Sequence, residues 1–251
     1  MPVRIGKTMR SLLLAGVAAA FAGPAGQAQD RSCADDAIIV FDGSGSMSET
    51  AFNAMDEPRI IDARRAMHRA VPRVAPVRRI GLMIYGPGGS DVCSNVDLRF
   101  GPVRNAGARI LAEIDALQPS GQTPLTIAVA RAAEALGAPE RSGIVVLVTD
   151  GKENCGGSPC RLGEALAVQA PSMTVHVIGF RMSSEFSDWP DDIREVPRTG
   201  GDSVMTRCLA ERTGGMYVMT QTVDELADAL TETLSCMVIG RLDGALLPPP
   251  A

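Results

Sequence analysis

A buried strand runs directly into a polar turn in the stretch Ile38–Ser46, which reads IIVFDGSGS. Four consecutive apolar residues are typical of a strand that is buried on both faces, as in the centre of a parallel sheet. The two glycines allow the chain to turn sharply after the strand. We therefore expect Asp42, Ser44 and Ser46 to face one point, where their oxygen atoms form the kind of ligand set that hard cations prefer.

Two further oxygen donors lie downstream, in positions from which an α/β sheet could return them to this point. Thr123 lies in the motif GQTPL, whose proline is typical of a first helical position. A second apolar run, GIVVLV at 143–148, leads into Asp150. The carboxyl ends of parallel strands meet at the edge where open α/β sheets bind ligands. Asp42 and Asp150 are therefore predicted at the same edge.

The first 28 residues have the features of a cleaved secretory signal peptide. Three basic residues precede an apolar stretch at 12–22, and the small-residue pattern Gly26-Gln27-Ala28 follows. The apolar stretch is shorter than the roughly 18 to 20 residues of a membrane-spanning helix. Retention as an uncleaved anchor is the alternative. We expect a periplasmic or secreted protein with no transmembrane segment after signal cleavage.

Length and charge limit the remaining possibilities. The 251 residues are 45% hydrophobic, which suits one folded domain. We place that domain at 29–236, followed by a C-terminal tail at 237–251 that is rich in proline. Removal of the signal peptide takes away three basic and no acidic residues, so the formal charge changes from −5 to −8. Such an acidic chain is not expected to bind nucleic acid.

Six cysteines remain after cleavage, an even number that predicts disulfides in an exported chain. They allow 15 pairings. One pair flanks a short turn, a second pair lies before the first strand and after the last helix, and a third pair is left over. The corresponding predicted bonds are Cys155–Cys160, Cys33–Cys236 and Cys93–Cys208. The chain lacks the spaced pairs of thiolate and imidazole ligands that are typical of zinc sites.

Strands and helices alternate along the rest of the chain. This alternation predicts an α/β fold with a doubly wound, mostly parallel sheet of about six strands and helices on both faces. One strand, at 96–100, follows only a glycine-rich loop and is expected to be an antiparallel edge strand. The predicted strands are 38–41, 79–85, 96–100, 143–148, 173–180 and 214–218. The predicted helices are 58–74, 108–117, 125–136, 161–168, 204–212 and a last helix after a capping box that begins at Thr222.

The combination of these motifs resembles a known family. DxSxS at 42–46, Thr123 in GxTPL, and Asp150-Gly151 after an apolar strand have the order and spacing of a von Willebrand factor type A (VWA) domain. The resemblance extends from about residue 35 to 234. The segments DGxExCGGxPC at 150–160 and CLAxxTGGxY at 208–217 are similar to exported bacterial single-domain members of that family.

The resemblance implies a metal-ion-dependent adhesion site (MIDAS) formed by five residues. Ser44 and Ser46 would bind the cation directly, Thr123 directly or through water, and Asp42 and Asp150 either directly or from just outside. Mg²⁺ is the expected cation, with Mn²⁺ and Ca²⁺ as alternatives. Because Mg²⁺ keeps some of its water ligands, one position stays open for another oxygen donor. The implied function is a protein-binding module, not an enzyme, that captures an exposed Asp or Glu of a protein partner.

Taken one at a time, the same residues have simpler interpretations. Thr123 could only cap a helix, and Asp150-Gly151 is a common turn pair. Glu49 and Glu153 are expected to be solvated charges in loops near the site. His176, in an apolar strand, is expected to be structural.

One segment departs from the exported relatives that the chain resembles. Residues 181–203 form a longer connection than is usual in the family and include Trp189, the single tryptophan. Our hypothesis is that Trp189 is a buried anchor in the interface with a partner. The alternative is that Trp189 covers the core of its own domain.

The residues fit two classes of enzyme less well than they fit an adhesion site. A phosphatase of the haloacid dehalogenase type needs a second Asp at the position of Ser44, and a serine hydrolase needs GxSxG and a suitable histidine. Two alternatives remain open. The first is a hydrolase that uses the same cation to activate water. The second is a structural protein of envelope assemblies in which the cation only stabilises the fold.

Overall fold

The computed structural model describes residues 1, 33, 35–50, 57–88, 93–151, 153–182 and 202–236, the side chains of 202–205 excepted. The described residues from 33 to 236 belong to one compact unit. Three of our predictions fall on residues outside this description: the signal peptide, Trp189 and the C-terminal tail.

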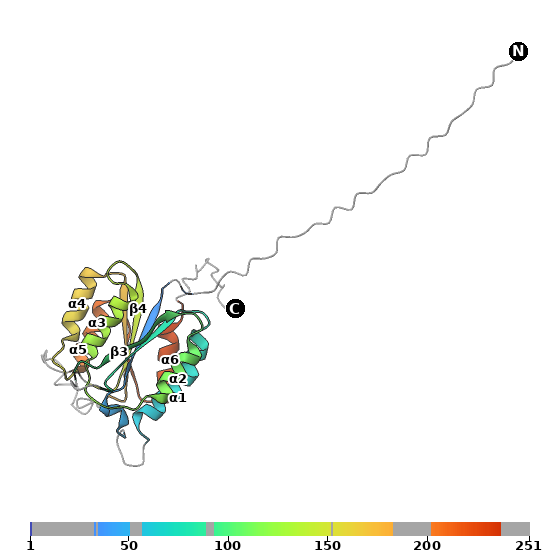
Figure 1. Ribbon diagram of the computed structural model, residues 1–251. Coiled ribbons are helices and arrows are strands. Elements are labelled where there is room, and N and C mark those ends of the chain that lie inside the picture. Colours follow the sequence, from blue (N-terminus) through green and yellow to red (C-terminus); the bar gives the residue numbers. More distant parts are fainter. Residues whose placement is uncertain are drawn as a thin grey trace, which may run out of the picture. The chain divides into compact units, whose positions relative to one another are not determined.

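A six-stranded sheet forms the centre of the protein (Figure 1). The order of its strands is β3-β2-β1-β4-β5-β6, and only β3 runs antiparallel to its neighbour. The strand bounds are β1 Ala37–Asp42, β2 Ile80–Tyr85, β3 Val96–Val103, β4 Gly143–Thr149, β5 Met173–Phe180 and β6 Tyr217–Thr220. The mostly parallel sheet with one antiparallel edge strand, as predicted, is confirmed.

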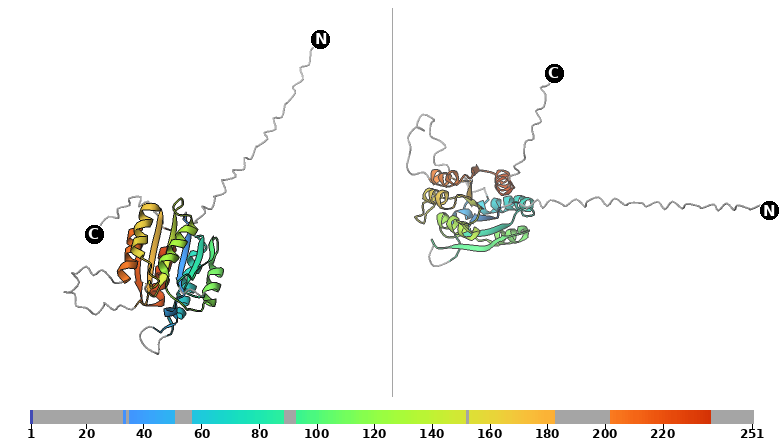
Figure 2. Two further views of the ribbon diagram at one scale, coloured as in Figure 1. Left: turned by 60° about the vertical axis from the view of Figure 1, so that its left-hand side comes forward. Right: turned by 90° about the horizontal axis from the view of Figure 1, so that it is seen from above.

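Helices cover both faces of this sheet, as the turned views in Figure 2 show. One face packs against α1, α2 and α6, and the other against α3, α4 and α5. The helix bounds are α1 Arg59–Val74, α2 Gly107–Ala116, α3 Leu125–Leu136, α4 Pro159–Gln169, α5 Asp202–Arg212 and α6 Val223–Leu234, with a short 3₁₀ helix η1 at Gly45–Ser48. The predicted capping box of α6 is present, with Thr222 and Glu225 bonding reciprocally.

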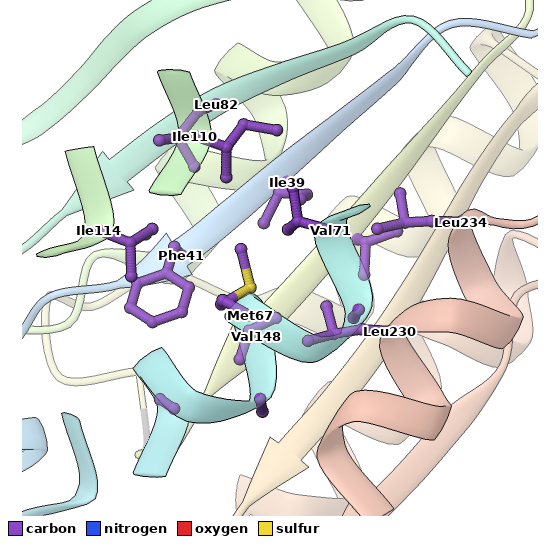
Figure 3. Packing of buried hydrophobic residues seen from close by; sticks show 14 of the residues in the cluster. Ile39, Phe41, Met67, Val71, Leu82, Ile110, Ile114, Val148, Leu230 and Leu234 are labelled. Carbon is purple, nitrogen blue, oxygen red and sulfur yellow. The ribbon is translucent and has the colours of Figure 1, made fainter. Parts of the chain in front are cut away.

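The side chains of β1 alternate between the two hydrophobic cores. Ile39 and Phe41 point towards α1 and α2, where Figure 3 shows them among Met67, Ile110 and other apolar side chains. Ile38 and Val40 point to the opposite face, towards α3. Because side chains on a strand alternate with a period of two, Asp42 continues the α3 side of this series. All six residues of β1 are buried, so this strand fixes Asp42 firmly at the carboxyl edge.

All six cysteines form disulfides, but only one predicted pair is correct. Cys33 bonds Cys236, which ties the start of β1 to the end of α6 as expected. The other two bonds are Cys93–Cys155 and Cys160–Cys208.

The predictions of Cys155–Cys160 and Cys93–Cys208 were wrong because α4 begins between the first two of these residues. Cys160 lies in the first turn of α4, which packs against α5 and so meets Cys208. Cys155 lies in the loop before that helix and meets the β2–β3 loop instead.

Candidate functional site

Asp42 is completely buried at the end of β1, and both of its carboxylate oxygens accept hydrogen bonds. Oδ1 accepts from the backbone N–H of Ser44 at 2.9 Å, and Oδ2 accepts from the hydroxyl of Thr149 at 2.7 Å. The Thr149 hydroxyl accepts in turn from the phenol of Tyr85 at 3.1 Å. Burial, together with the charge of Asp42, raises the pKa of Tyr85, so this phenol remains a donor. Asp42 therefore holds the serine turn against the ends of two neighbouring strands.

The serine turn reaches the end of β4 through a chain of oxygen atoms. The hydroxyls of Ser44 and Ser46 lie 3.0 Å apart, and the Ser46 hydroxyl donates to Oδ1 of Asp150 at 2.7 Å. Ser44 and Asp150 are buried, whereas Ser46 is partly exposed. Residues more than 100 positions apart in the sequence thus meet at the carboxyl edge, as the strand ends predict.

Thr123 reaches the same point from the loop before α3. A Cβ placed on Gly151 would lie 3.5 Å from the Ser46 hydroxyl and 3.8 Å from the Thr123 hydroxyl. The two hydroxyls therefore border the same small space. Close packing of backbones makes this possible, because a Cβ on Gly121, whose φ is +79°, would come within 2.1 Å of the Gly86 carbonyl oxygen. The helix that follows begins at Leu125, as predicted, but Pro124 occupies its N-cap rather than its first helical position.

The polar atoms at this edge fit a divalent cation. Oδ2 of Asp150 is buried and has no hydrogen-bond partner among the described residues. Burial and the nearby charge of Asp42 raise the pKa of Asp150 to about 7. A cation would supply the missing partner and favour the ionised carboxylate. Two carboxylates and three hydroxyls make an all-oxygen set, which suits Mg²⁺, Mn²⁺ or Ca²⁺ better than thiolate-preferring metals.

The hydroxyls are essential to this interpretation. Within the described ranges, no three His, Cys, Asp or Glu side chains come together as a metal-binding group. Coordination at this edge would therefore depend on Ser44, Ser46 and Thr123 as well as on the carboxylates. The residues that could hold the cation are Asp42, Ser44, Ser46, Thr123 and Asp150.

A buried arginine, which the sequence analysis did not single out, lies beside the carboxylates. Arg59 is the first residue of α1 and is 8% exposed. Its Nη1 donates to the carbonyl oxygen of Ser46 at 2.9 Å and lies 3.5 Å from Oδ2 of Asp150. The side chain of Glu49, which is 69% exposed, lies 3.6 Å from the same nitrogen. A permanent positive charge is therefore part of the site.

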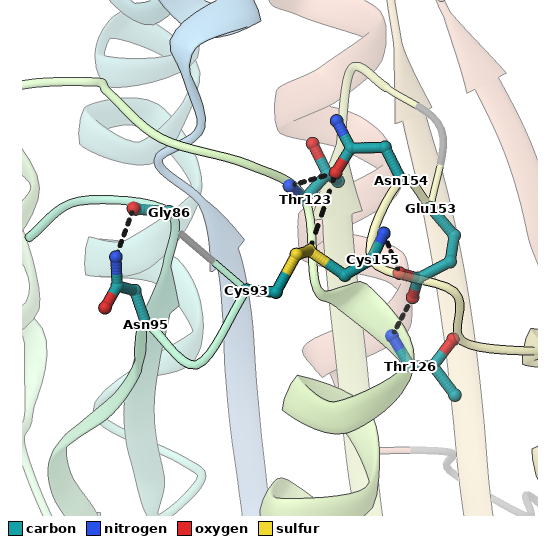
Figure 4. The surroundings of a disulfide bond; sticks show 8 residues. All are labelled: Gly86, Cys93, Asn95, Thr123, Thr126, Glu153, Asn154 and Cys155. Atoms are coloured by element: carbon teal, nitrogen blue, oxygen red, sulfur yellow. Dashed lines mark hydrogen bonds between the residues drawn. A yellow bond between two sulfur atoms is a disulfide. The ribbon is translucent and has the colours of Figure 1, made fainter. Parts of the chain in front are cut away.

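The loop that carries Thr123 is held by the segment after β4, as Figure 4 shows. Oδ1 of Asn154 accepts from the backbone N–H of Thr123 at 2.7 Å. Glu153 accepts from the backbone N–H of Thr126 at 2.8 Å and from that of Cys155 at 2.9 Å. The Cys93–Cys155 disulfide fixes this segment to the β2–β3 loop. Glu153 is thus bound to two backbone segments, and our expectation of a solvated loop charge was wrong.

The sequence of the chain matches a family model at the residues that form this edge. Residues 37–153, from the start of β1 to the loop after β4, match the model of the von Willebrand factor type A domain. This chain carries a VWA domain. The match includes all five candidate ligands, and VWA domains are in general protein-interaction modules.

Relatives of this VWA domain include an uncharacterized protein of Bacillus subtilis, YwmD. The two sequences are 26% identical over 234 residues, which cover 88% of this chain and 96% of YwmD. The match therefore spans most of both sequences.

Solved structures with the same fold come from distant sources. An aerotolerance-related membrane protein from Bacteroides fragilis superposes with a TM-score of 0.57 at 16% identity, covering 80% of this chain and 98% of that chain. Proximal thread matrix protein 1 from the mussel byssus, solved with a zinc-occupied MIDAS motif, gives a TM-score of 0.55 at 20% identity. That match covers 82% of this chain and 46% of the mussel chain. At these identities the likeness shows the VWA fold alone.

The sequence patterns identify the candidate ligands of the VWA domain but not the roles of the residues that support them. Arg59, Glu153 and Asn154 belong to loops and a helix start that have no characteristic spacing. For Arg59 one signal was present in the sequence, because a basic residue in the first turn of a helix opposes the helix dipole.

Proposed function

We propose that this protein is an exported, metal-ion-dependent protein-binding module with no catalytic activity of its own. In this proposal a divalent cation binds at the carboxyl edge of the sheet and an acidic side chain of a protein partner completes its coordination. The match to the VWA family, whose domains are in general protein-interaction modules, supports this proposal.

The observation that carries the proposal is the state of Asp150. One of its oxygens binds Ser46, and the other is buried without a partner in the described part of the chain. Buried polar atoms without partners are rare in folded proteins, and each needs an explanation such as an ion or a water molecule. The orphaned oxygen belongs to the carboxylate that binds the Ser46 hydroxyl, which itself lies 3.0 Å from the Ser44 hydroxyl, and this group of oxygen atoms favours an ion.

The residues of the site would have different roles in binding the cation. Ser44, Ser46 and Thr123 offer neutral hydroxyl ligands, so a bound cation would keep much of its positive charge. Asp42 is occupied by two strong hydrogen bonds and would orient Ser44. With two carboxylates in the candidate ligand set, the cation would remain attractive to an incoming Asp or Glu. Mg²⁺ is our first choice because it binds few protein ligands and keeps an exchangeable position.

Export is supported by the cysteines. All six form disulfides, and disulfides persist in oxidising compartments such as the periplasm or the cell exterior. No helix in the described part of the chain is long and apolar enough to cross a bilayer.

The first test is calorimetric titration of Mg²⁺, Mn²⁺ and Ca²⁺ into the metal-free protein, followed by capture of partners from envelope extract with and without EDTA. Ser44→Ala should abolish both cation binding and EDTA-sensitive capture, because it removes one hydroxyl but leaves the backbone bond to Asp42. The matched control is Ser48→Ala, an exposed serine of the same turn, which should behave as wild type.

Two outcomes would contradict the proposal. Capture that is unaffected by both EDTA and Ser44→Ala would favour a structural role in envelope assemblies. Metal-dependent turnover of generic phosphatase or esterase substrates that disappears in Asp42→Ala would favour a metal-assisted hydrolase.

A further inference from the structure

Arg59 is placed where it should destabilise the isolated protein. A positive charge at the N-terminus of α1 opposes the helix dipole, which favours acidic residues there. The guanidinium is almost fully buried, and its Nε has no hydrogen-bond partner within the described residues. Buried charges without complete hydrogen bonding are costly. Residues that violate several such rules at once are expected at functional sites.

The contact between Arg59 and Asp150 is electrostatic rather than a hydrogen bond. The distance of 3.5 Å between Nη1 and Oδ2 exceeds the usual 2.7–3.2 Å of such bonds. Among the described residues, this guanidinium donates one hydrogen bond, to the neutral carbonyl of Ser46. Arg59 therefore acts on the site mainly through its charge, and a guanidinium keeps that charge at all ordinary pH values.

The charge of Arg59 should have opposite effects on the two partners of the site. Without it, two ionised carboxylates would fully balance a divalent cation. With it, the guanidinium repels an incoming cation, and a cation-loaded site keeps one net positive charge that attracts an anion. Glu49 could offset this charge, but its side chain is 69% exposed and therefore screened by water.

On this basis, and resting on the proposed function above, we propose that Arg59 is a specificity-determining residue of the site. It lowers the affinity for the divalent cation and, in exchange, raises the affinity of the cation-loaded site for a carboxylate ligand. The site is then selective for acidic partners rather than for tight retention of metal.

The test measures both affinities in the same set of variants. Calorimetry gives the dissociation constant of Mn²⁺. Water-proton relaxation of the Mn²⁺-loaded protein then follows sodium acetate as it displaces bound water. Arg59→Gln removes the charge but keeps a donor for the Ser46 carbonyl, and Arg59→Lys keeps the charge. The control is Arg73→Gln, which removes one exposed charge at the other end of α1.

For Arg59→Gln we expect about tenfold tighter Mn²⁺ binding and about tenfold weaker acetate binding, an order-of-magnitude estimate for a nearby unit charge in a partly screened environment. Arg59→Lys and Arg73→Gln should stay close to wild type in both measurements. Glu49→Gln, at an exposed position that should tolerate the change, should shift both affinities in the opposite direction by a smaller factor.

Other outcomes of these measurements would contradict either this inference or the proposed function. If both affinities fall together in Arg59→Gln, Arg59 only supports the structure of the site, and the inference is wrong. Unchanged affinities in both Arg59→Gln and Glu49→Gln would also overturn it. If the wild-type protein binds no Mn²⁺ at all, the proposed function itself fails, a result that the variants cannot mimic.

Discussion

Two buried arginines lie at opposite edges of the sheet, and their surroundings differ. Arg78, before β2 at the amino edge, donates to the carbonyl oxygens of Leu234 at 2.7 Å, Asp35 at 2.6 Å and Ser235 at 3.0 Å. Arg59, at the carboxyl edge, donates to one carbonyl and leaves its Nε unpaired among the described residues. An arginine with a partner at every side-chain nitrogen is typical of a structural role, whereas incomplete bonding beside an orphaned carboxylate oxygen is what the proposed ligand site would produce.

The largest effect is expected from Arg78, which holds both ends of the domain together. Arg78→Met would leave three carbonyls without their donor and should lower the free energy of unfolding by about 3 kcal/mol or more. The half-exposed neighbour Arg79 provides the control, since Arg79→Met should cost under about 1 kcal/mol. Urea denaturation measures both. The Mn²⁺ affinity of the folded Arg78→Met protein should stay within about twofold of wild type. A large loss of affinity would show that the two edges of the sheet do not act independently.

The disulfides sharpen the same comparison. Cys93–Cys155 closes 62 residues and Cys160–Cys208 closes 48, so removal of either should cost a similar amount, roughly 2 to 4 kcal/mol. Only the first bond holds the segment that positions Thr123. The double variant Cys93→Ser/Cys155→Ser should therefore bind Mn²⁺ several-fold more weakly, while Cys160→Ser/Cys208→Ser should keep the wild-type affinity. Equal cation affinities in the two double variants would show that this segment does not position Thr123.

A glycine tests how far the site depends on close backbone contact. In Gly121→Ala the new methyl group would collide with the Gly86 carbonyl at a backbone angle unfavourable for alanine. We expect a loss of about 2 kcal/mol in stability and weaker Mn²⁺ binding. Gly101→Ala, where a Cβ meets nothing within 4 Å, is the control. If Gly121→Ala binds Mn²⁺ as wild type does, the Thr123 loop is more adaptable than the packing indicates.

The smallest effect concerns pH and the amino edge. Burial and the charge of Arg78 lower the pKa of His176 from 6.5 to about 4, and its Nδ1 accepts from the backbone N–H of Met216 at 3.0 Å. Between these values the unfolded chain binds the proton on this residue and the folded protein does not, so the contribution of His176 to stability should decrease as pH falls from about 6.5 to 4. Asp150, whose pKa is raised to about 7, acts in the opposite direction but is present in both proteins, so His176→Gln should become more stable relative to wild type as pH falls through this window. If the free energy of unfolding changes with pH in the same way for the two proteins between pH 7 and 4, this assignment is wrong.

The fold and the candidate ligands could be predicted because they depend on local patterns. An apolar strand that ends in Asp42 and another that leads to Asp150 define one edge of a parallel sheet, whatever the details of the loops. The bond Cys33–Cys236 could be predicted for a similar reason, since both residues lie at the ends of the domain.

The supporting contacts could not be predicted because they depend on how loops meet in space. Proximity along the chain suggested Cys155–Cys160, but the start of α4 directs these two residues towards different partners. Arg59 and Asn154 act across loops whose conformation is set by glycine contacts and a disulfide. Such contacts produce no periodic pattern in the sequence. These contacts adjust the site, whereas the strand ends define where it lies.

Both proposals depend on the binding of one divalent cation among Asp42, Ser44, Ser46, Thr123 and Asp150. Its most direct test is an anomalous difference map from crystals grown with Mn²⁺. We expect one strong peak in contact with the hydroxyls of Ser44 and Ser46, at the coordination distance of about 2.1 Å that is usual for a small divalent cation. A peak at another place, or an ordered water in contact with the free oxygen of Asp150 despite saturating Mn²⁺, would contradict it.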